Sequence, residues 1–123
     1  MKYMLLIYGD EQAAAHASPE QQQQVGDAYE AFTQSIRTSG NFLDGDPFWP
    51  TTTAKSVHVG DGGTETSDGP TVATDPQLVA YYKVSADSPE QAVEMASRVP
   101  GAQWGSVEVR QIVEFDSDGR PLM

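Results

Sequence analysis

The side chain with the most evident chemical potential is an aspartate at a tight corner. Residues 66–84 read TSDGPTVATDPQLVAYYKV, and the corner is Asp68-Gly69-Pro70. An aspartate that opens a turn ordinarily accepts a hydrogen bond from the backbone N–H two residues on, and here that position is a proline without an N–H. We therefore expect the Asp68 carboxylate either to brace the loop through another donor or to face solvent or a ligand.

The two histidines, His16 and His58, are candidates for proton transfer, because an unperturbed imidazole titrates near neutral pH. His16 lies in an Ala-rich polar stretch before a predicted helix, where a surface role is the simpler interpretation. His58 lies in a segment of alternating residues, where it serves either the strand or acid–base chemistry. If His58 and Asp68 approached each other, the aspartate would fix the imidazole tautomer and the pair could act as a general base.

Aromatic side chains are the chain's main resource for binding an apolar ligand. Most of them are expected in the core or in a dimer interface, which leaves one or two to line a small cavity. The candidates for ligand contacts, chosen for their positions near the corner and at strand ends, are Tyr8, Trp49, Pro70 and Tyr81.

We predict no metal site and no cofactor. The two histidines are far apart in the sequence, cysteine is absent, and what remains is scattered carboxylates. The segment GDGG at 60–63 is a turn signal and does not open a helix as a phosphate-binding loop does.

The charge balance argues against several partners. Eighteen acidic residues against seven basic ones give a formal net charge of −11, and the basic residues are scattered. Direct contacts with nucleic acid and with anionic membranes are therefore disfavoured. The absence of cysteine fits a reducing compartment, so we expect a cytoplasmic protein, and no apolar run approaches the roughly 20 residues that span a bilayer.

Two helices are predicted by nearly identical start signals, Ser-Pro-Glu-Gln at 18–21 and again at 88–91. Each offers an N-cap serine, a proline in the first turn and a glutamine at the capping-box position. An apolar stripe at three- and four-residue spacing follows the first signal, and Gly40 is expected to end that helix.

Strands are predicted at 2–8, 53–59 with a return to about 66, around 81–84, and 106–115. The first strand is apolar on both faces, with Tyr3, Leu5 and Ile7 on one and Met4, Leu6 and Tyr8 on the other. The stretch GNFLDGDPFWP at 40–50 is too rich in Gly, Asp and Pro for a regular strand to be assigned.

This order of elements predicts an α+β, ferredoxin-like domain at residues 1–115, followed by a short mobile C-terminal tail at 116–123. Two helices cover only one face of the antiparallel sheet, while the first strand is apolar on both. The second face therefore needs cover, most simply from the same face of another copy. We predict a homodimer whose facing sheets enclose cavities, a dimeric α+β barrel.

The chain resembles the YCII-related family, in particular its DGPF branch. The resemblance rests on the opening MKYMLLIYGDE, the DGP corner, the paired tyrosines at 81–82, the segment SPEQAVEMASRVP and the closing GSVEVR. It implies a dimeric α+β barrel, often in uncharacterised bacterial proteins, some of which are encoded beside or fused to extracytoplasmic-function sigma factors. It also implies either a role connected with transcription initiation or an enzymatic activity that uses a histidine and an aspartate.

The chain departs from the branch just after the corner. Where the branch usually reads DGPF-A-E-T-K-E-Q-L-G-G-Y-Y, this chain reads DGPTVATDPQLVAYY, with Thr71, Ala73 and Asp75 in place of the aromatic, the acid and the lysine. We therefore predict a small-ligand-binding or regulatory dimeric domain. The alternatives are a small-molecule enzyme that uses Asp68, with or without His58, in a cavity near the dimer interface, and a plain dimeric scaffold.

Overall fold

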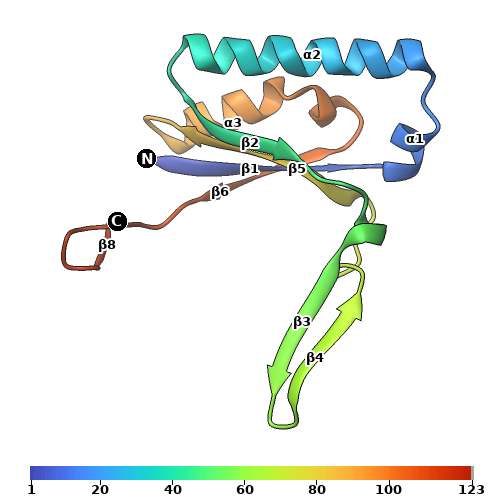
Figure 1. Cartoon of the computed structure of the whole chain (residues 1–123). Helices are drawn as coiled ribbons and strands as arrows, with labels where there is room; N and C mark the ends of the chain where they lie inside the picture. The colour runs from blue at the N-terminus through green and yellow to red at the C-terminus, as the bar shows by residue number, and fades with distance from the viewer. Residues whose placement is uncertain (123) are drawn as a thin grey trace.

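Four antiparallel strands form the central sheet in the order β2-β5-β1-β6 (Figure 1). The computed structural model describes residues 1–122. The strands are β1 (Lys2–Gly9), β2 (Phe42–Pro47), β5 (Gln77–Ser85) and β6 (Ser106–Gln111). The central strand β1 pairs with β5 on one side and with β6 on the other, as a split β-α-β arrangement requires. The fold is therefore α+β and of the ferredoxin-like type.

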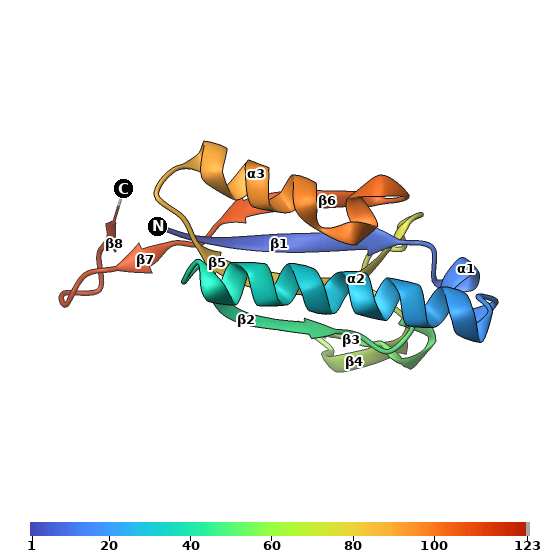
Figure 2. The ribbon, with the colours of Figure 1, turned by 90° about the horizontal axis from the view of Figure 1, so that it is seen from above.

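Two long helices, α2 (Pro19–Thr38) and α3 (Pro89–Arg98), cover one face of this sheet (Figures 1 and 2). Seen from above, α3 lies over the β6 side and α2 over the β5 side (Figure 2). A further five-residue helix, α1 (Glu11–Ala15), follows β1 directly and was not predicted. The Asp10 side chain caps α1 by accepting hydrogen bonds from the backbone N–H groups of Gln12 and Ala13.

The predicted start of α2 is confirmed by a complete capping box. Ser18 Oγ accepts a hydrogen bond from the Gln21 N–H at 3.1 Å, and the Gln21 side chain accepts one from the Ser18 N–H at 2.9 Å. Ser88 also caps α3, accepting from the Gln91 N–H at 3.1 Å, but the Gln91 side chain accepts from the Asp87 N–H and so does not complete a capping box. Gly40, with φ +81°, takes the left-handed conformation just after α2, as the sequence predicted.

The core lies between the sheet and the helices. On β1, Tyr3, Leu5 and Ile7 are buried beneath the helices, while Met4, Leu6 and Tyr8 are half-buried on the opposite face. We call that opposite, helix-free surface the open face. The other buried apolar residues are Phe32, Ile36, Tyr82, Val84, Ala86, Ala92, Met95, Ala96 and Val99.

Strand β2 forms within the Gly- and Pro-containing stretch that the sequence left unassigned. It lies at the edge of the sheet, where the proline at its end is tolerated because one side of the strand needs no ladder partner. Gly45 faces the Tyr82 ring, and a Cβ at that position would lie 2.7 Å from Tyr82 Cδ1. The glycine that weakened the strand prediction is thus what lets β2 lie against this tyrosine.

The last predicted strand divides into two. β6 ends at Gln111, and the two-residue strands β7 (Glu114–Phe115) and β8 (Pro121–Leu122) then pair as a small hairpin. Phe115 is 61% exposed. The predicted apolar face of the strand at 106–115 therefore does not reach the core at its end. The mobility predicted for residues 116–123, and the domain boundary at 115, stay predictions.

A second hairpin, β3 (Lys55–Gly60) and β4 (Gly63–Asp68), stands away from the body on the side opposite the helices (Figure 1). We call residues 55–68 the arm. A short 3₁₀ turn (Thr51–Thr53) joins the arm to β2. Glu11 of α1 fixes this base, because its carboxylate accepts hydrogen bonds from the Thr51 N–H and hydroxyl, each at 2.8 Å.

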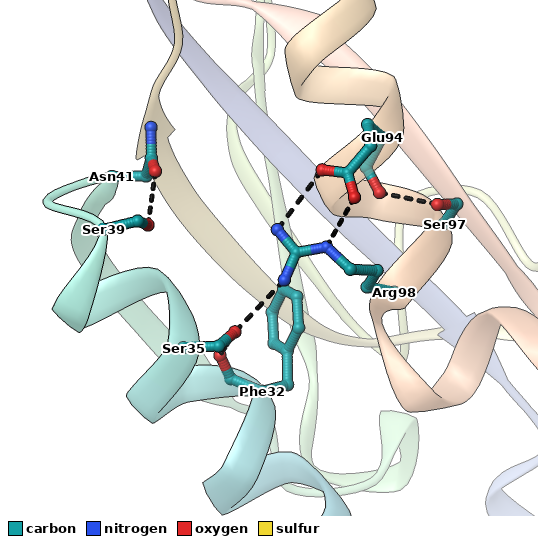
Figure 3. Close-up of polar contacts among 7 residues, drawn as sticks. All are labelled: Phe32, Ser35, Ser39, Asn41, Glu94, Ser97 and Arg98. Carbon is teal, nitrogen blue, oxygen red and sulfur yellow. Dashed lines mark hydrogen bonds and ion pairs between the residues drawn. The ribbon is translucent and has the colours of Figure 1, made fainter.

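The two long helices are joined by a polar clamp (Figure 3). Arg98 Nε donates to Glu94 at 2.8 Å, and another guanidinium nitrogen donates to the Ser35 hydroxyl at 3.2 Å. The Arg98 guanidinium also lies 5.8 Å from the centroid of the Phe32 ring.

In residues 1–122 no helix is both long enough and apolar enough to span a membrane.

Candidate functional site

A largely apolar cavity of about 500 Å³ opens between α2 and the edge of the sheet. We call it the α2–β2 groove. A volume of this size is typical of small-molecule sites. Its lining comes from one face of α2, from β2 and from the middle of β5, namely Tyr29, Thr33, Arg37, Phe42, Gly45, Asp46, Pro47, Val79, Ala80, Tyr81 and Tyr82.

One wall of the groove is formed by side chains on a single face of α2. Tyr29, Thr33 and Arg37 follow each other at intervals of four residues, which places them on one side of the helix. The opposite wall is the edge strand β2, which pairs with β5. The groove exists because α2 does not fully cover the edge of the sheet.

Tyr82 lies at the centre of the groove's aromatic lining. Its ring packs edge-on against Phe32 at a centroid distance of 5.2 Å and against Phe42 at 6.4 Å. Such edge-to-face pairs stabilise by about 0.5–1.5 kcal/mol beyond the area they bury. The Tyr82 hydroxyl lies 2.7 Å from the Thr33 hydroxyl. The pair places polar atoms that can both donate and accept within an apolar cavity.

Tyr29 is held from the other side. Its hydroxyl accepts a hydrogen bond from the Gly101 N–H at 3.1 Å, and a Cβ on Gly101 would lie only 2.6 Å from that hydroxyl. Burial raises the pKa of Tyr29, and the hydrogen bond from Gly101 offsets part of that rise. Tyr29 therefore stays a neutral, fixed wall of the groove.

Arg37 is the cationic group of the groove. Its guanidinium carbon lies 4.3 Å from the centroid of the Phe42 ring, a cation–π geometry. Within residues 1–122, the ion pairs involve other basic residues and leave Arg37 without a carboxylate partner. The groove thus combines an apolar body, two adjacent hydroxyls and one uncommitted positive charge.

The structure does not bring the predicted catalytic residues together within one chain. Asp68 and His58 both lie on the arm, where Asp68 is paired with Lys55 and His58 with Glu65. Alternation along the strands places the two side chains on opposite faces of the hairpin, offset by three residues, or roughly 10 Å. The Asp68–His58 general base therefore does not form within a single protomer.

Asp68 has a cationic partner instead. Its carboxylate accepts from Lys55 Nζ across the base of the arm, and the Asp68 side chain is 84% exposed. The next residues are tied down by other groups: the Gly69 N–H donates to the Ala54 carbonyl and the Ser56 hydroxyl donates to the Gly69 carbonyl, each at 2.8 Å. Asp68 thus pairs with Lys55 at the base of the arm while its side chain faces solvent.

The predicted ligand-binding residues are dispersed. Pro70 is exposed at the arm's base and Trp49 is 84% exposed. Tyr8 is half-buried on the open face, where it borders a shallower hollow of about 420 Å³ with Thr74, Asp75, Pro76, Ser106, Val107 and Glu108. Tyr81 alone of the four lines the α2–β2 groove.

Tyr81 carries the strongest perturbation of a titrating group. Its hydroxyl donates to Asp46 at 2.8 Å and approaches Asp44 at 3.4 Å, and its ring stacks on Phe48 at a centroid distance of 5.8 Å. The hydrogen bond to Asp46, together with desolvation and the charges of both carboxylates, raises the pKa of Tyr81 to about 12. Ionising the phenol would oppose two carboxylates and lose a donor.

A tyrosine with a raised pKa makes the fold sensitive to alkali. The neutral phenol is the form the fold favours, so its contribution is fully present below the unfolded pKa of about 10 and is lost as the pH rises through about 12. We expect Asp46→Asn to shift one tyrosine titration, followed by phenolate absorbance, to lower pH. Asp27→Asn on the outer surface of α2 is the matched control; equal titration curves for both variants would contradict this assignment.

Among residues 1–122, no three His, Asp or Glu side chains lie close enough to hold a metal ion together. Apart from Tyr81, the residues that sequence reasoning missed are those of the groove, in particular Thr33, Arg37 and Phe42. The four-residue spacing of Tyr29, Thr33 and Arg37 on α2 was a readable signal. Their placement against β2 was not, because the strand itself could not be assigned.

The YCII-related domain family matches residues 1–116. The chain belongs to the YCII-related family. It is 29% identical over 117 residues to the uncharacterized protein R00369 of Rhizobium meliloti (strain 1021), and the match covers 94% of each chain. This family membership confirms the resemblance drawn from the chain's motifs.

Among solved structures, this YCII-related chain is similar to 5-chloro-2-hydroxyhydroquinone dehydrochlorinase (TftG) from Burkholderia phenoliruptrix AC1100, in complex with 2,5-dihydroxybenzoquinone. The TM-score is 0.54 with 11% identity, over 97% of this chain and 99% of that one. At this identity the likeness concerns the fold, and it agrees with the ferredoxin-like strand order.

Proposed function

We propose that this YCII-related chain binds a small, planar, largely apolar ligand in the α2–β2 groove and acts as a homodimer. The observation that carries the ligand-binding proposal is the groove itself, a cavity of about 500 Å³ with aromatic walls and one hydroxyl pair. Sites of this kind bind mainly through apolar contact, and a few placed polar groups set the orientation.

A planar ring suits the shape and chemistry of this lining. Phe42 and Tyr82 offer aromatic surfaces, and the adjacent Thr33 and Tyr82 hydroxyls can donate to or accept from a ring substituent. The TftG complex contains 2,5-dihydroxybenzoquinone, a planar six-membered ring with oxygen substituents that could hydrogen-bond to such hydroxyls. This supports the ligand class and leaves the reaction open.

The homodimer is proposed from the open face. Its apolar centre consists of Met4, Leu6, Tyr8 and Leu78, all half-buried in the single chain. Charged side chains lie beside this centre: Lys83 and Arg110 flank Met4, Glu108 flanks Leu6, and Arg110 pairs with Glu108 within the chain. A two-fold axis through the face would let each copy cover the same apolar centre on the other, as a self-complementary interface requires.

The arm also favours a dimer. It projects on the side of the open face, and each of its strands has six residues, or roughly 20 Å (Figure 1). Stacked sheets lie about 10 Å apart. In a dimer formed through the open faces, the arm of one copy would therefore pass alongside the other copy, where the exposed Val57 and Val59 would find cover.

The alternative function is a small-molecule enzyme, and the arm is the feature that favours it. His58 and Asp68 do not meet within a protomer, so either would act on a ligand only when delivered by the arm of the second copy. The dehydrochlorinase activity named for TftG makes proton transfer a relevant chemistry to test. Association with a sigma factor is an expectation from the family resemblance only, and a cytoplasmic location is an expectation from the absence of cysteine.

A groove-filling variant tests the ligand site. We expect Thr33→Phe to occupy the groove and remove the hydroxyl partner of Tyr82, and so to abolish the thermal stabilisation that planar ring compounds give the wild-type protein. A ligand at about 100-fold excess over its dissociation constant stabilises by about 2.7 kcal/mol, which a thermal-shift screen detects readily.

Gln34→Phe is the matched control for this screen. Gln34 is the next residue on α2, is exposed and does not line the groove. The proposal expects the same hits for Gln34→Phe as for the wild type and none for Thr33→Phe. Hits that persist in Thr33→Phe, or a library of planar rings that stabilises neither the wild type nor the control, would refute a ligand site in this groove.

A further inference from the structure

We infer that the ligand of the α2–β2 groove is a planar monoanion, such as an aromatic carboxylate, whose negative group pairs with Arg37. This inference rests on the proposed function and adds the charge of the ligand to it. It begins from an arginine that lines an apolar cavity and has no carboxylate partner within residues 1–122.

Arg37 differs from the two arginines that form ion pairs, Arg98 and Arg110. Arg98 is occupied by Glu94 and Ser35 (Figure 3), and Arg110 is paired with Glu108 at 3.1 Å. Arg37 instead lies over the Phe42 ring, which orients the guanidinium without using its N–H donors. Five donors in a planar fork match a carboxylate in two-point geometry.

The acidic side chain in the lining of the groove, Asp46, forms no ion pair with Arg37. Its carboxylate instead accepts a hydrogen bond from the Tyr81 hydroxyl at 2.8 Å. The net charge of −11 opposes an anion at long range, and salt screens exposed charges over about 8 Å at physiological ionic strength. Among the lining residues of the groove, Arg37 is the basic side chain that an anion could pair with.

The dimensions of the groove fit a ring with one acidic substituent. Thr33 and Arg37 are one turn apart on α2, so their positions differ by about 6 Å along the helix axis. A ring placed against Phe42 and the Thr33–Tyr82 hydroxyl pair would bring a carboxylate attached to it within reach of the guanidinium. Arg37 also lies in the last turn of α2, where the helix dipole weakly opposes an anion, so we expect a moderate preference.

Benzoate and benzamide test this inference because they share a planar ring and differ in charge. We expect the wild-type protein to bind benzoate on the order of 10-fold more tightly than benzamide in calorimetric titrations, since charge-assisted hydrogen bonds are stronger than neutral ones. Arg37→Gln should remove this preference by weakening benzoate alone, and Arg37→Lys should retain part of it. Arg120→Gln, which removes the same charge from the C-terminal hairpin, should leave both affinities unchanged.

The outcomes separate the charge of the ligand from the existence of the site. Equal affinity for benzoate and benzamide in the wild type, or a preference that survives Arg37→Gln, would overturn the inference while groove binding stands. Binding of neutral rings with no binding of benzoate would overturn it as well. If neither compound binds and Thr33→Phe has no effect on any planar ring, the proposed function fails too.

Discussion

Replacing Leu6 by arginine is expected to convert the protein from a dimer to a monomer. Leu6 lies at the centre of the open face on the middle strand, flanked by Tyr81 and Glu108. In the proposed dimer each copy would bury this side chain against the other. Two unpaired cations in a closed interface have a desolvation cost of several kcal/mol, so the dissociation constant should rise at least about 100-fold.

The measurement is the molar mass by light scattering or sedimentation over a range of concentrations. Val93→Arg is the matched control, because Val93 is 57% exposed on α3, on the other side of the sheet, and the same side chain is introduced. We expect the control to remain dimeric and both variants to retain wild-type circular dichroism. A wild-type protein of single-chain mass, or a dimer that Leu6→Arg leaves intact, would show that the open face is not the interface.

Replacing Leu5 by alanine is expected to have the largest effect on the fold. Leu5 is the neighbour of Leu6 on β1 but points to the opposite face, where it is 0% exposed beneath the helices. Truncating a fully buried leucine removes apolar contact and leaves a cavity, which together cost about 2–5 kcal/mol. For a domain of this size that is a large share of the total stability.

Urea denaturation of Leu5→Ala and of Leu6→Ala tests whether these two neighbours lie on opposite faces of β1. In the monomeric Leu6→Arg variant, adding Leu5→Ala should still lower the free energy of unfolding by about 2–5 kcal/mol. In the dimer, Leu6→Ala should lower the free energy of unfolding by weakening association rather than the core, so this loss should disappear in protein diluted to the monomer. Equal losses for the two alanine variants in dilute monomer would contradict the assignment of the two faces.

The two long helices and the central strand could be predicted because their signals are local. The N-caps at Ser18 and Ser88 and the alternation of β1 depend on neighbouring residues alone, and the structure reproduces them. Strand β2 could not be assigned, because its order comes from pairing with β5 and from the space that Gly45 leaves for Tyr82. Composition does not report either contact.

The candidate site was predicted less well than the fold, because it depends on contacts between residues that are distant in the sequence. We considered a general base formed by His58 and Asp68 across the hairpin, yet the register of the hairpin places the two side chains on opposite faces. That register follows from the GDGG turn and could have been counted. The groove could not be predicted in the same way, since Thr33 and Phe42 become neighbours only when α2 packs beside an edge strand that the sequence left undefined.

The most direct test of the account is a titration of the wild-type protein with benzoate and with benzamide, followed by amide NMR. The account predicts that both rings perturb the signals of Thr33, Phe42 and Tyr82 around the groove, and that benzoate adds a perturbation at Arg37. If the groove signals stay unchanged at saturating concentrations, or if the perturbations fall instead on the arm around His58 and Asp68, the groove is not the ligand site.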